Sequence, residues 1–302
     1  MANQSKWQRL PTEAMNPATR HIDMMAMPDI LELMIADNRH VLEAVEREKD
    51  LIAQVAEIFA DALRGGGRLI FVGAGTSGRL GVLEAAEMPP TFGLSSKSVL
   101  AIMAGGKDAV HRAKEGVEDD EKEGGKAVGK LRPSKRDVVV GVSASGVTPF
   151  VRGALMRAMR AGSHIVGVTC DPQSAMREFA DPVISLAVGP EVIAGSTRLK
   201  SGTATKVVLN MLTTSAMIKI GKTYGNLMVD VQSNSEKLRD RGRRIIGTVT
   251  GLGYDEADAL LRRAKWNVKA AIVMQKAGLT HAKALQRLRA SRDSVREAIG
   301  EG

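Results

Sequence analysis

The chain has 302 residues, of which 44% are hydrophobic, so it can bury a sizeable core in one large domain with a small appendage. Its formal net charge of +9 and pI near 9.7 are compatible with nucleic-acid binding, but only 3% of its residues are aromatic. Aromatic platforms for stacking bases are therefore scarce, and solvated helix faces late in the chain explain the basic residues. We expect no nucleic-acid partner.

The single cysteine, Cys170, excludes an intrachain disulfide and a thiolate-rich zinc site. Because a lone cysteine fits a reducing compartment, we expect a cytoplasmic protein. The N-terminal residues lack an apolar signal core, and the most apolar window, 207–220, is interrupted by Asn210 and Lys219. The sequence therefore predicts no membrane-spanning segment.

Residues 1–66 are predicted to form an irregular arm followed by helices. The arm, residues 10–23, contains two prolines and many polar groups, whereas apolar residues recur at helical spacing from residue 30 to residue 63. Two interpretations of the arm remain open, because its polar side chains either cap and pack the arm or cross toward a functional site. The side chains concerned are those of Thr12, Glu13, Asn16, Thr19 and Arg20.

From residue 67 onward, apolar segments alternate with helical patterns. The segments are continuous in Val, Ile and Leu, which is typical of parallel strands covered on both faces. They comprise residues 68–72, 98–104, 137–142, 164–169 and 183–188. We therefore predict a doubly wound α/β domain with a five-stranded parallel sheet over residues 67–248.

Past Gly251 the pattern changes to short amphipathic helices. Three are predicted, with breaks at Gly253 and Gly278, and they cover residues 255–264, 267–277 and 281–299. These helices indicate a small separate unit over residues 249–302. Its role remains open between packing or dimerisation and the recognition of another protein.

A glycine-rich turn follows the first predicted strand. Three glycines in segment 73–78, the last of them Gly78, bracket Thr76 and Ser77, and a helical pattern then runs to Glu87. Free N–H groups at the start of this helix favour an anion, and the two hydroxyls suit a phosphate monoester. The acidic residue that a dinucleotide site needs about 20 positions later is missing. Glycines can also merely turn the chain, so this turn alone does not establish a phosphate site.

A second turn of the same kind follows the third predicted strand. It contains Ser143, Ser145, Gly146 and Thr148 at the start of a helix. In open parallel sheets ligands bind beyond the carboxyl ends of the strands, so both turns are expected at one edge. No triad partner for Ser145 is evident, so we interpret these serines as binding residues and not as nucleophiles.

A third helix start, in segment 195–203, is also rich in donors. Ser196 and Lys200 lie there before a long apolar helix and suit an anionic substrate. The alternative is that Ser201 or Thr203 caps the helix while the cations face solvent.

Among the acidic residues, Glu87 is the first candidate for chemistry. It is expected in the last turn of its helix, before Pro89 and Pro90, where the negative end of the helix dipole should raise its pKa. A protonated Glu at this position could act as a general acid.

Glu118 lies in a segment, 107–124, that is predicted to be one helix. The many acidic residues of this segment are typical of a solvated face, and the pattern does not single out one carboxylate. His111 and Glu115 share helical spacing, but one histidine among carboxylates is ordinarily a surface feature. We therefore expect no metal site.

Six segments together resemble the sugar isomerase (SIS) fold family of sugar-phosphate proteins, and within it the N-acetylmuramic acid 6-phosphate etherases. They comprise residues 12–23, 73–93 (GAGTSGRLGVLEAAEMPPTFG), 113–120, 141–151 (GVSASGVTPFV), 189–206 and 224–241. The resemblance implies a three-layer αβα SIS fold, a homodimer and a small-molecule sugar-phosphate ligand. It implies no metal or other cofactor.

The resemblance also implies a reaction, the cleavage of the D-lactyl ether at C3 of N-acetylmuramate 6-phosphate. Glu87 matches the proton donor of these etherases, and Glu118 matches their second catalytic acid, which would remove the C2 proton. Two alternatives remain. The similar glucokinase regulatory protein binds sugar phosphates without catalysis, and other SIS-fold proteins are aldose-ketose isomerases.

Overall fold

The computed structural model describes residues 9–231 and 235–301. The chain divides into two compact units, and each is described by itself. The first comprises Met1–Ala85 and Lys97–Thr213, and the second Ala86–Ser96 and Thr214–Gly302. Among the described residues, no helix is both long enough and apolar enough to cross a bilayer.

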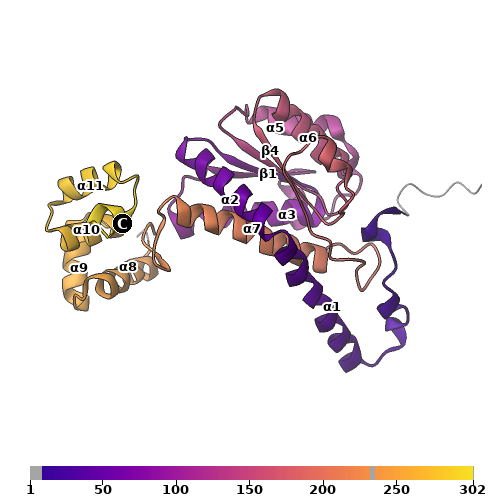
Figure 1. The fold of residues 1–302 in the computed structure, drawn as a ribbon, viewed down its shortest axis with the longest axis horizontal. Helices are drawn as coiled ribbons and strands as arrows, with labels where there is room; N and C mark the ends of the chain where they lie inside the picture. The colour runs from indigo at the N-terminus through magenta and orange to yellow at the C-terminus, as the bar shows by residue number, and fades with distance from the viewer. Residues whose placement is uncertain (1–8, 232–234, 302) are drawn as a thin grey trace, which may run out of the picture. The chain divides into compact units, whose positions relative to one another are not determined.

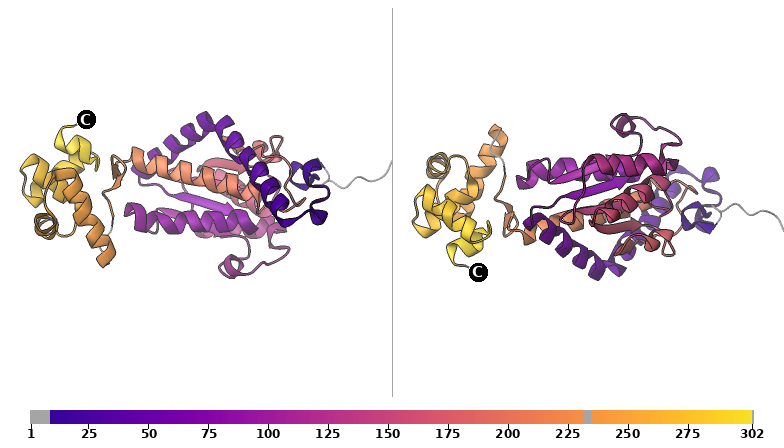
Figure 2. Two further views of the ribbon diagram at one scale, coloured as in Figure 1. Left: turned by 90° about the horizontal axis from the view of Figure 1, so that it is seen from below. Right: turned by 90° about the horizontal axis from the view of Figure 1, so that it is seen from above.

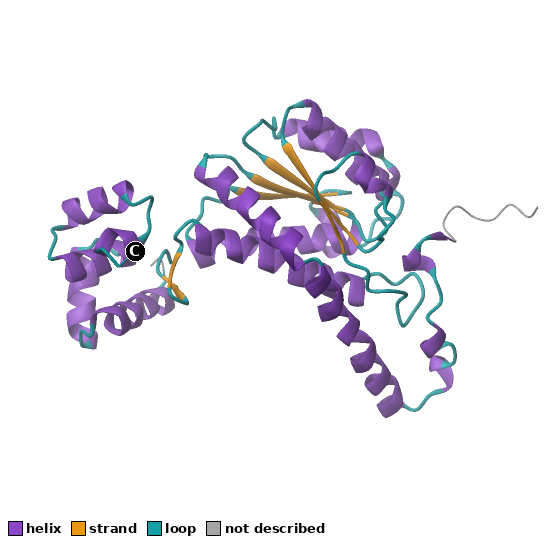
Figure 3. Ribbon diagram, in the orientation of Figure 1, coloured by secondary structure: helices purple, strands orange, loops and turns teal. Residues whose placement is uncertain are grey.

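The first unit contains a sheet of five parallel strands in the order β2-β1-β3-β4-β5 (Figure 3). The strands are β1 (Leu69–Gly73), β2 (Val99–Met103), β3 (Val138–Val142), β4 (His164–Thr169) and β5 (Val183–Ser185). This arrangement confirms the predicted doubly wound sheet. The chain winds outward in both directions from β1 and β3, which are adjacent, so the turns that follow these two strands lie at the topological switch point.

Helices cover both faces of this sheet (Figure 1). One face carries α5 (Glu121–Lys130) and α6 (Pro149–Arg160), and the other carries α2 (Lys49–Arg64), α3 (Gly75–Phe92) and α7 (Lys200–Lys219). The side chains of β1 alternate between the two faces. Ile70 packs in one core cluster with Phe150 of α6, whereas the Phe71 ring lies 6.3 Å from the Phe59 ring of α2.

Helices α5 and α6 approach each other through two glycines. A Cβ atom added to Gly124 would lie 1.9 Å from the Phe150 carbonyl oxygen, and one added to Gly153 would lie 1.9 Å from the Glu121 carbonyl oxygen. Because real Cβ atoms do not come so close to backbone atoms, both positions require glycine. The two helix backbones are therefore in direct contact.

An ion pair joins the N-terminal ends of β1 and β3. Arg68 donates to Asp137 from Nε (3.0 Å) and Nη2 (2.8 Å), and the Ser134 backbone N–H also donates to this carboxylate (2.8 Å). Burial raises the pKa of Asp137, but the hydrogen bonds from Arg68 and Ser134 outweigh burial and hold the pKa below its usual range. The Asp137 side chain is only 3% exposed.

At the other end of the sheet, Cys170 follows β4 and is buried against α7. Its Sγ atom lies 3.8 Å from the Ser201 carbonyl oxygen, the acceptor of a weak hydrogen bond.

The structure corrects the predicted end of the helix that contains Glu87. Helix α3 does not stop at the two prolines but continues through Pro89 and Pro90 to Phe92. Proline in a helix removes a backbone hydrogen bond and its ring crowds the carbonyl of residue i−4, but both prolines lie in the last turn of α3, so most of the helix is unaffected. Glu87 is therefore followed by more than one further turn.

The single helix predicted over residues 107–124 is also wrong. The segment consists of α4 (Asp108–His111), the 3₁₀ turn η5 (Val117–Asp119) and the start of α5. Gly116, with φ of +76°, interrupts the helical path, and the Asp120 carboxylate accepts a hydrogen bond from the Glu123 N–H to cap α5. Glu118 consequently lies on a short turn and not on a helix face.

The first unit also contains the N-terminal region. The arm forms three 3₁₀ turns and is followed by a long helix, and their bounds are η2 (Pro11–Glu13), η3 (Pro17–Thr19), η4 (Ile22–Met24) and α1 (Met27–Arg47). A further 3₁₀ turn, η6 (Ala175–Glu178), lies between β4 and β5.

The second unit is mostly helical. It contains a two-stranded hairpin, β6 (Thr223–Tyr224) and β7 (Leu227–Met228), with α8 (Glu236–Thr250), α9 (Tyr254–Arg263), α10 (Val268–Ala277), α11 (His281–Ala290) and α12 (Val295–Ile299). The last predicted helix is two helices, because Arg292 and Asp293 have positive φ angles and turn the chain. Helix α8, which the prediction assigned to the sheet domain, packs with α9 and α10. The compact unit therefore begins before residue 249.

Candidate functional site

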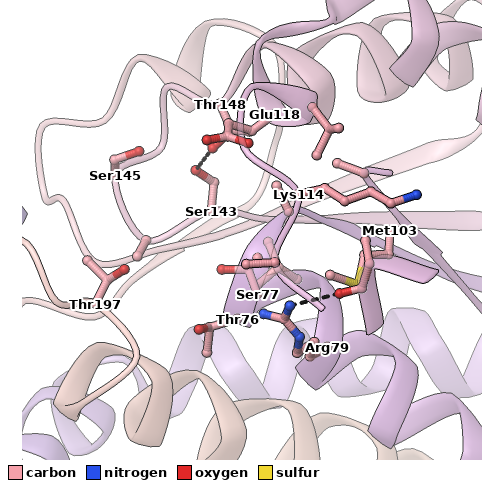
Figure 4. Close-up of a pocket in the computed structure, with 18 of the residues that line it drawn as sticks. Thr76, Ser77, Arg79, Met103, Lys114, Glu118, Ser143, Ser145, Thr148 and Thr197 are labelled. Carbon is pink, nitrogen blue, oxygen red and sulfur yellow. Dashed lines mark hydrogen bonds between the residues drawn. The ribbon is translucent and has the colours of Figure 1, made fainter. Parts of the chain in front are cut away.

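A cavity of about 310 Å³ lies where β1 and β3 end (Figure 4). Its lining comes from five segments of the first unit. They are residues 12–13 of the arm, 74–79 at the start of α3, 103–118 after β2, 142–148 after β3 and 195–197 before α7. The two turns predicted to share one edge of the sheet both contribute to this cavity.

The first turn presents two hydroxyls to the cavity. Gly78 packs against Gly73, since a Cβ atom at Gly78 would lie 2.8 Å from the Gly73 carbonyl oxygen, and Gly75 has φ of +52°. These glycines permit the tight turn, so Gly78 shapes the site without lining it. Thr76 and Ser77 do line the cavity, and the described residues provide no hydrogen-bond partner for their hydroxyls.

The second turn divides its hydroxyls between two roles. The Ser143 Oγ and Thr148 Oγ1 atoms are 2.7 Å apart, and Ser143 Oγ also accepts a hydrogen bond from the Gly146 N–H (3.0 Å). Gly146 has φ of +70°, and a Cβ atom there would lie 1.7 Å from Ser174 Oγ. Ser143 and Thr148 line the cavity, but their hydroxyls are paired within the turn, and Gly146 shapes the turn without lining the cavity. Ser145 lines the cavity, and its hydroxyl has no partner among the described residues.

The donors at the third predicted site, the start of α7, are already paired with acidic side chains of the protein. The buried Glu191 carboxylate accepts hydrogen bonds from the Lys200 N–H (3.0 Å) and the Ser201 N–H (2.9 Å) at the start of α7. The Lys200 ammonium lies 2.7 Å from Asp37 on α1, and its side chain is 3% exposed. Lys200 therefore neither lines the cavity nor faces solvent. Ser196 does not line the cavity either, although its neighbours at positions 195 and 197 do.

The arm takes both of the roles that the sequence left open. Thr12 and Glu13 line the cavity, as the crossing interpretation requires. Asn16 instead holds the arm in place, because its Nδ2 donates to Asp37 Oδ1 and to the Pro190 carbonyl oxygen, both at 3.3 Å.

Two cationic side chains of the cavity were missed by the sequence analysis. Arg79 donates to the carbonyl oxygens of Val110 (2.9 Å) and Ala109 (2.8 Å), and so ties α4 to α3. The Lys114 ammonium donates a hydrogen bond to Asp108 (3.3 Å), the first residue of α4. Arg79 stands one helical turn after Thr76, and this spacing was the available signal for it.

Comparisons with known proteins identify the family of the chain. Residues 50–159 match the family model described as the glucokinase regulatory protein N-terminal SIS domain. An N-acetylmuramic acid 6-phosphate etherase of Geobacillus thermodenitrificans is 44% identical over 97% of this chain and 99% of its own length. One of Rubrobacter xylanophilus is 45% identical over 97% of both chains. The chain belongs to the N-acetylmuramic acid 6-phosphate etherase family.

The solved structure of a phosphoheptose isomerase from Neisseria gonorrhoeae is also similar. It aligns with a TM-score of 0.49 and 17% identity, and the alignment covers 63% of this chain and 98% of the isomerase.

The two acids that the resemblance to the etherase family singled out have different positions. Glu118 is half-buried on η5 and lines the cavity (Figure 4). Glu87 is exposed on α3, about three turns beyond Thr76, and does not line the cavity. Within the described residues, no group of three or more His, Cys, Asp or Glu side chains could hold a metal ion.

Proposed function

We propose that the protein cleaves the D-lactyl ether of N-acetylmuramate 6-phosphate and releases N-acetylglucosamine 6-phosphate and D-lactate, as a carbon-oxygen lyase. The observation that carries the proposal is the cavity at the switch point of the sheet. It combines unpartnered hydroxyls at a helix start with the carboxylate of Glu118, in a chain that is 44% identical to an etherase over nearly its whole length. The lone, buried Cys170 supports a cytoplasmic location.

The phosphate is assigned to the hydroxyls of Thr76, Ser77 and Ser145. These groups have no partner in the described protein, and the first N–H groups of α3 are available beside them. The start of α7 is the less suitable place for an anion, because Glu191 already accepts its N–H groups.

Glu118 is proposed to start the chemistry. When the sugar ring is open, the C2 proton lies next to the C1 aldehyde and is acidic enough for a carboxylate to remove. The electron pair of the C2–H bond forms a double bond between C2 and C3 as the C3–O bond breaks. Glu87 would donate a proton to the departing lactate oxygen. Water then adds to C3, and a proton returns to C2.

A homodimer accounts for the position of Glu87. Because Glu87 does not line the cavity of its own chain, we propose that each site receives Glu87 from the second copy. In this arrangement both acids act on one substrate, although only Glu118 lines the cavity of its own chain.

Release of D-lactate tests the proposal directly. Purified protein is expected to release D-lactate from N-acetylmuramate 6-phosphate, and Glu118→Gln is expected to abolish release while inorganic phosphate still binds. A folded wild-type protein that binds sugar phosphates but releases no lactate would favour the sensor alternative. Conversion of glucosamine 6-phosphate to a ketose would favour the isomerase alternative.

A further inference from the structure

The arm is fixed on both sides of Glu13. The Gly195 N–H donates to the Thr12 carbonyl oxygen (3.0 Å), and Asn16 bonds to Asp37 and to the Pro190 carbonyl oxygen. The side chains of Thr12 and Glu13 are thus placed at the cavity by a backbone that is held to the rest of the first unit. They come from a segment of the chain other than the two hydroxyl-bearing turns.

Thr12 has an unused hydroxyl at the cavity. The residue is 3% exposed, and its Oγ1 atom is buried without a hydrogen-bond partner among the described residues. Buried polar groups are normally paired, so the protein leaves this hydroxyl available to a ligand group that reaches the Thr12 side chain.

The next residue, Glu13, adds an exposed acceptor to the lining of the cavity. A Cβ atom at Gly195 would lie 3.1 Å from Glu13 Oε2, and Gly195 has φ of +77°, so glycine leaves room for the carboxylate. Within the described part of the chain, no cation pairs with Glu13. An ionised carboxylate only accepts hydrogen bonds, and it repels phosphate and carboxylate groups. Its suitable ligands here are neutral O–H and N–H groups.

We infer that Thr12 and Glu13 recognise the neutral part of the substrate, with the Glu13 carboxylate accepting hydrogen bonds from sugar hydroxyl or amide N–H groups and Thr12 supplying a second contact. The inference rests on the proposed function, which supplies an amino-sugar phosphate as the ligand. It divides the site into a phosphate part at Thr76, Ser77 and Ser145 and a sugar part formed by the arm.

The test compares a sugar phosphate with inorganic phosphate. Glu13→Gln is expected to raise the KM for N-acetylmuramate 6-phosphate by about tenfold or more, the effect of losing a hydrogen bond to a charged group, while kcat changes less. Thr12→Val keeps the shape of the side chain and is expected to raise KM in the same way. The inhibition constant for inorganic phosphate should stay within about twofold of the wild-type value in both variants, because the phosphate part of the site is unchanged.

Asp23→Asn is the matched control. It makes the same change of carboxylate to amide in the same arm, at an exposed residue outside the cavity, and is expected to leave KM and kcat unchanged. Thermal unfolding of each variant verifies that the arm and the sheet remain folded.

Two results would overturn the inference. The first is a KM within about twofold of wild type in both Glu13→Gln and Thr12→Val. The second is a loss of affinity for inorganic phosphate as large as the loss of affinity for the sugar phosphate. If the wild-type protein releases no D-lactate, the proposed function fails. Calorimetric binding of N-acetylglucosamine 6-phosphate and of inorganic phosphate to the same variants then still decides whether the arm recognises the sugar.

Discussion

The hydroxyls of the cavity fall into two groups. Those of Thr76, Ser77 and Ser145 have no partner in the described protein, whereas Ser143 and Thr148 bond to each other. The sequence predicted all five as binding residues from their position after two strands, but it could not separate the groups. Whether a hydroxyl is free depends on the path of the turn, and Gly146 sets that path through its contact with Ser174.

This separation predicts opposite effects for two similar substitutions. Ser77→Ala or Ser145→Ala should raise KM several-fold with kcat largely kept, since each removes one donor to the phosphate and nothing that the fold uses. Ser143→Ala should lower the melting temperature, because it removes two hydrogen bonds within the turn. Steady-state kinetics and thermal unfolding of the three variants check this. An unchanged KM in both Ser77→Ala and Ser145→Ala would remove these residues from the phosphate site.

The buried ion pair between Arg68 and Asp137 predicts a dependence of stability on pH. The pKa of Asp137 lies below its usual range, so its contribution to stability is present above the unfolded-state pKa of about 3.9 and is lost as the pH falls through the folded-state value. Asp137→Asn should therefore destabilise the protein strongly at pH 7 and much less near pH 3. Urea unfolding at several pH values measures the difference.

Asp61→Asn provides the control for the pH dependence. Asp61 also pairs with an arginine, Arg64 (3.1 Å), but its side chain is 75% exposed. Exposed pairs contribute little, so this variant should differ little from wild type at any pH. A difference for Asp137→Asn that stays constant with pH would contradict the role given to its ionised form.

The contact between α5 and α6 positions two of the turns that line the cavity. Helix α5 follows the turn that carries Glu118, and α6 follows the turn that carries Ser145. The glycines at 124 and 153 allow these two helices to touch, and so help to fix the turn of Glu118 relative to the turn of Ser145.

Gly153→Ala should therefore separate the two helices. Its Cβ atom would lie 1.9 Å from a backbone oxygen, which cannot move without moving α5, and overpacking of this kind costs about 1–3 kcal/mol. Chemical denaturation measures the loss. The control is Gly129→Ala on the partner helix α5, where the nearest atom lies 3.5 Å away and alanine should be neutral or stabilising. Equal effects of both substitutions would show that helix contact is not the cause.

The strands were predictable within about one or two residues, except that β5 ends earlier, because continuous apolar segments are a strong local signal. The errors arose where a local pattern was misread or a distant partner decided the outcome. Gly116 and the capping Asp120 were visible in the sequence but were read as part of one helix. Lys200 was predicted to bind substrate, and its actual partner, Asp37, is on α1, which no local pattern reveals. The place of Glu13 likewise depends on contacts between the arm and residue 195.

The proposed sharing of the two acids between the chains of a dimer predicts complementation between inactive variants. If each site combines Glu118 of one chain with Glu87 of the other, a dimer of Glu87→Gln and Glu118→Gln chains has one complete site. Random mixing should then restore about one quarter of the wild-type activity, because half of the dimers are mixed and each has one of its two sites. Lactate release after co-expression of the two variants measures this. Absence of any recovery in verified mixed dimers would place both acids of a site in one chain.

Because Cys170 is buried in the native fold, the reactivity of its thiol can be used to measure unfolding. Burial raises the pKa of Cys170 to about 12, and α7 covers it. An alkylating reagent should therefore leave the native chain unlabelled and react with Cys170 only when the first unit unfolds. The rate of labelling then measures this unfolding without an engineered probe. A cysteine introduced elsewhere on the surface would be the sole reactive sulfur and could carry a dye to a chosen position.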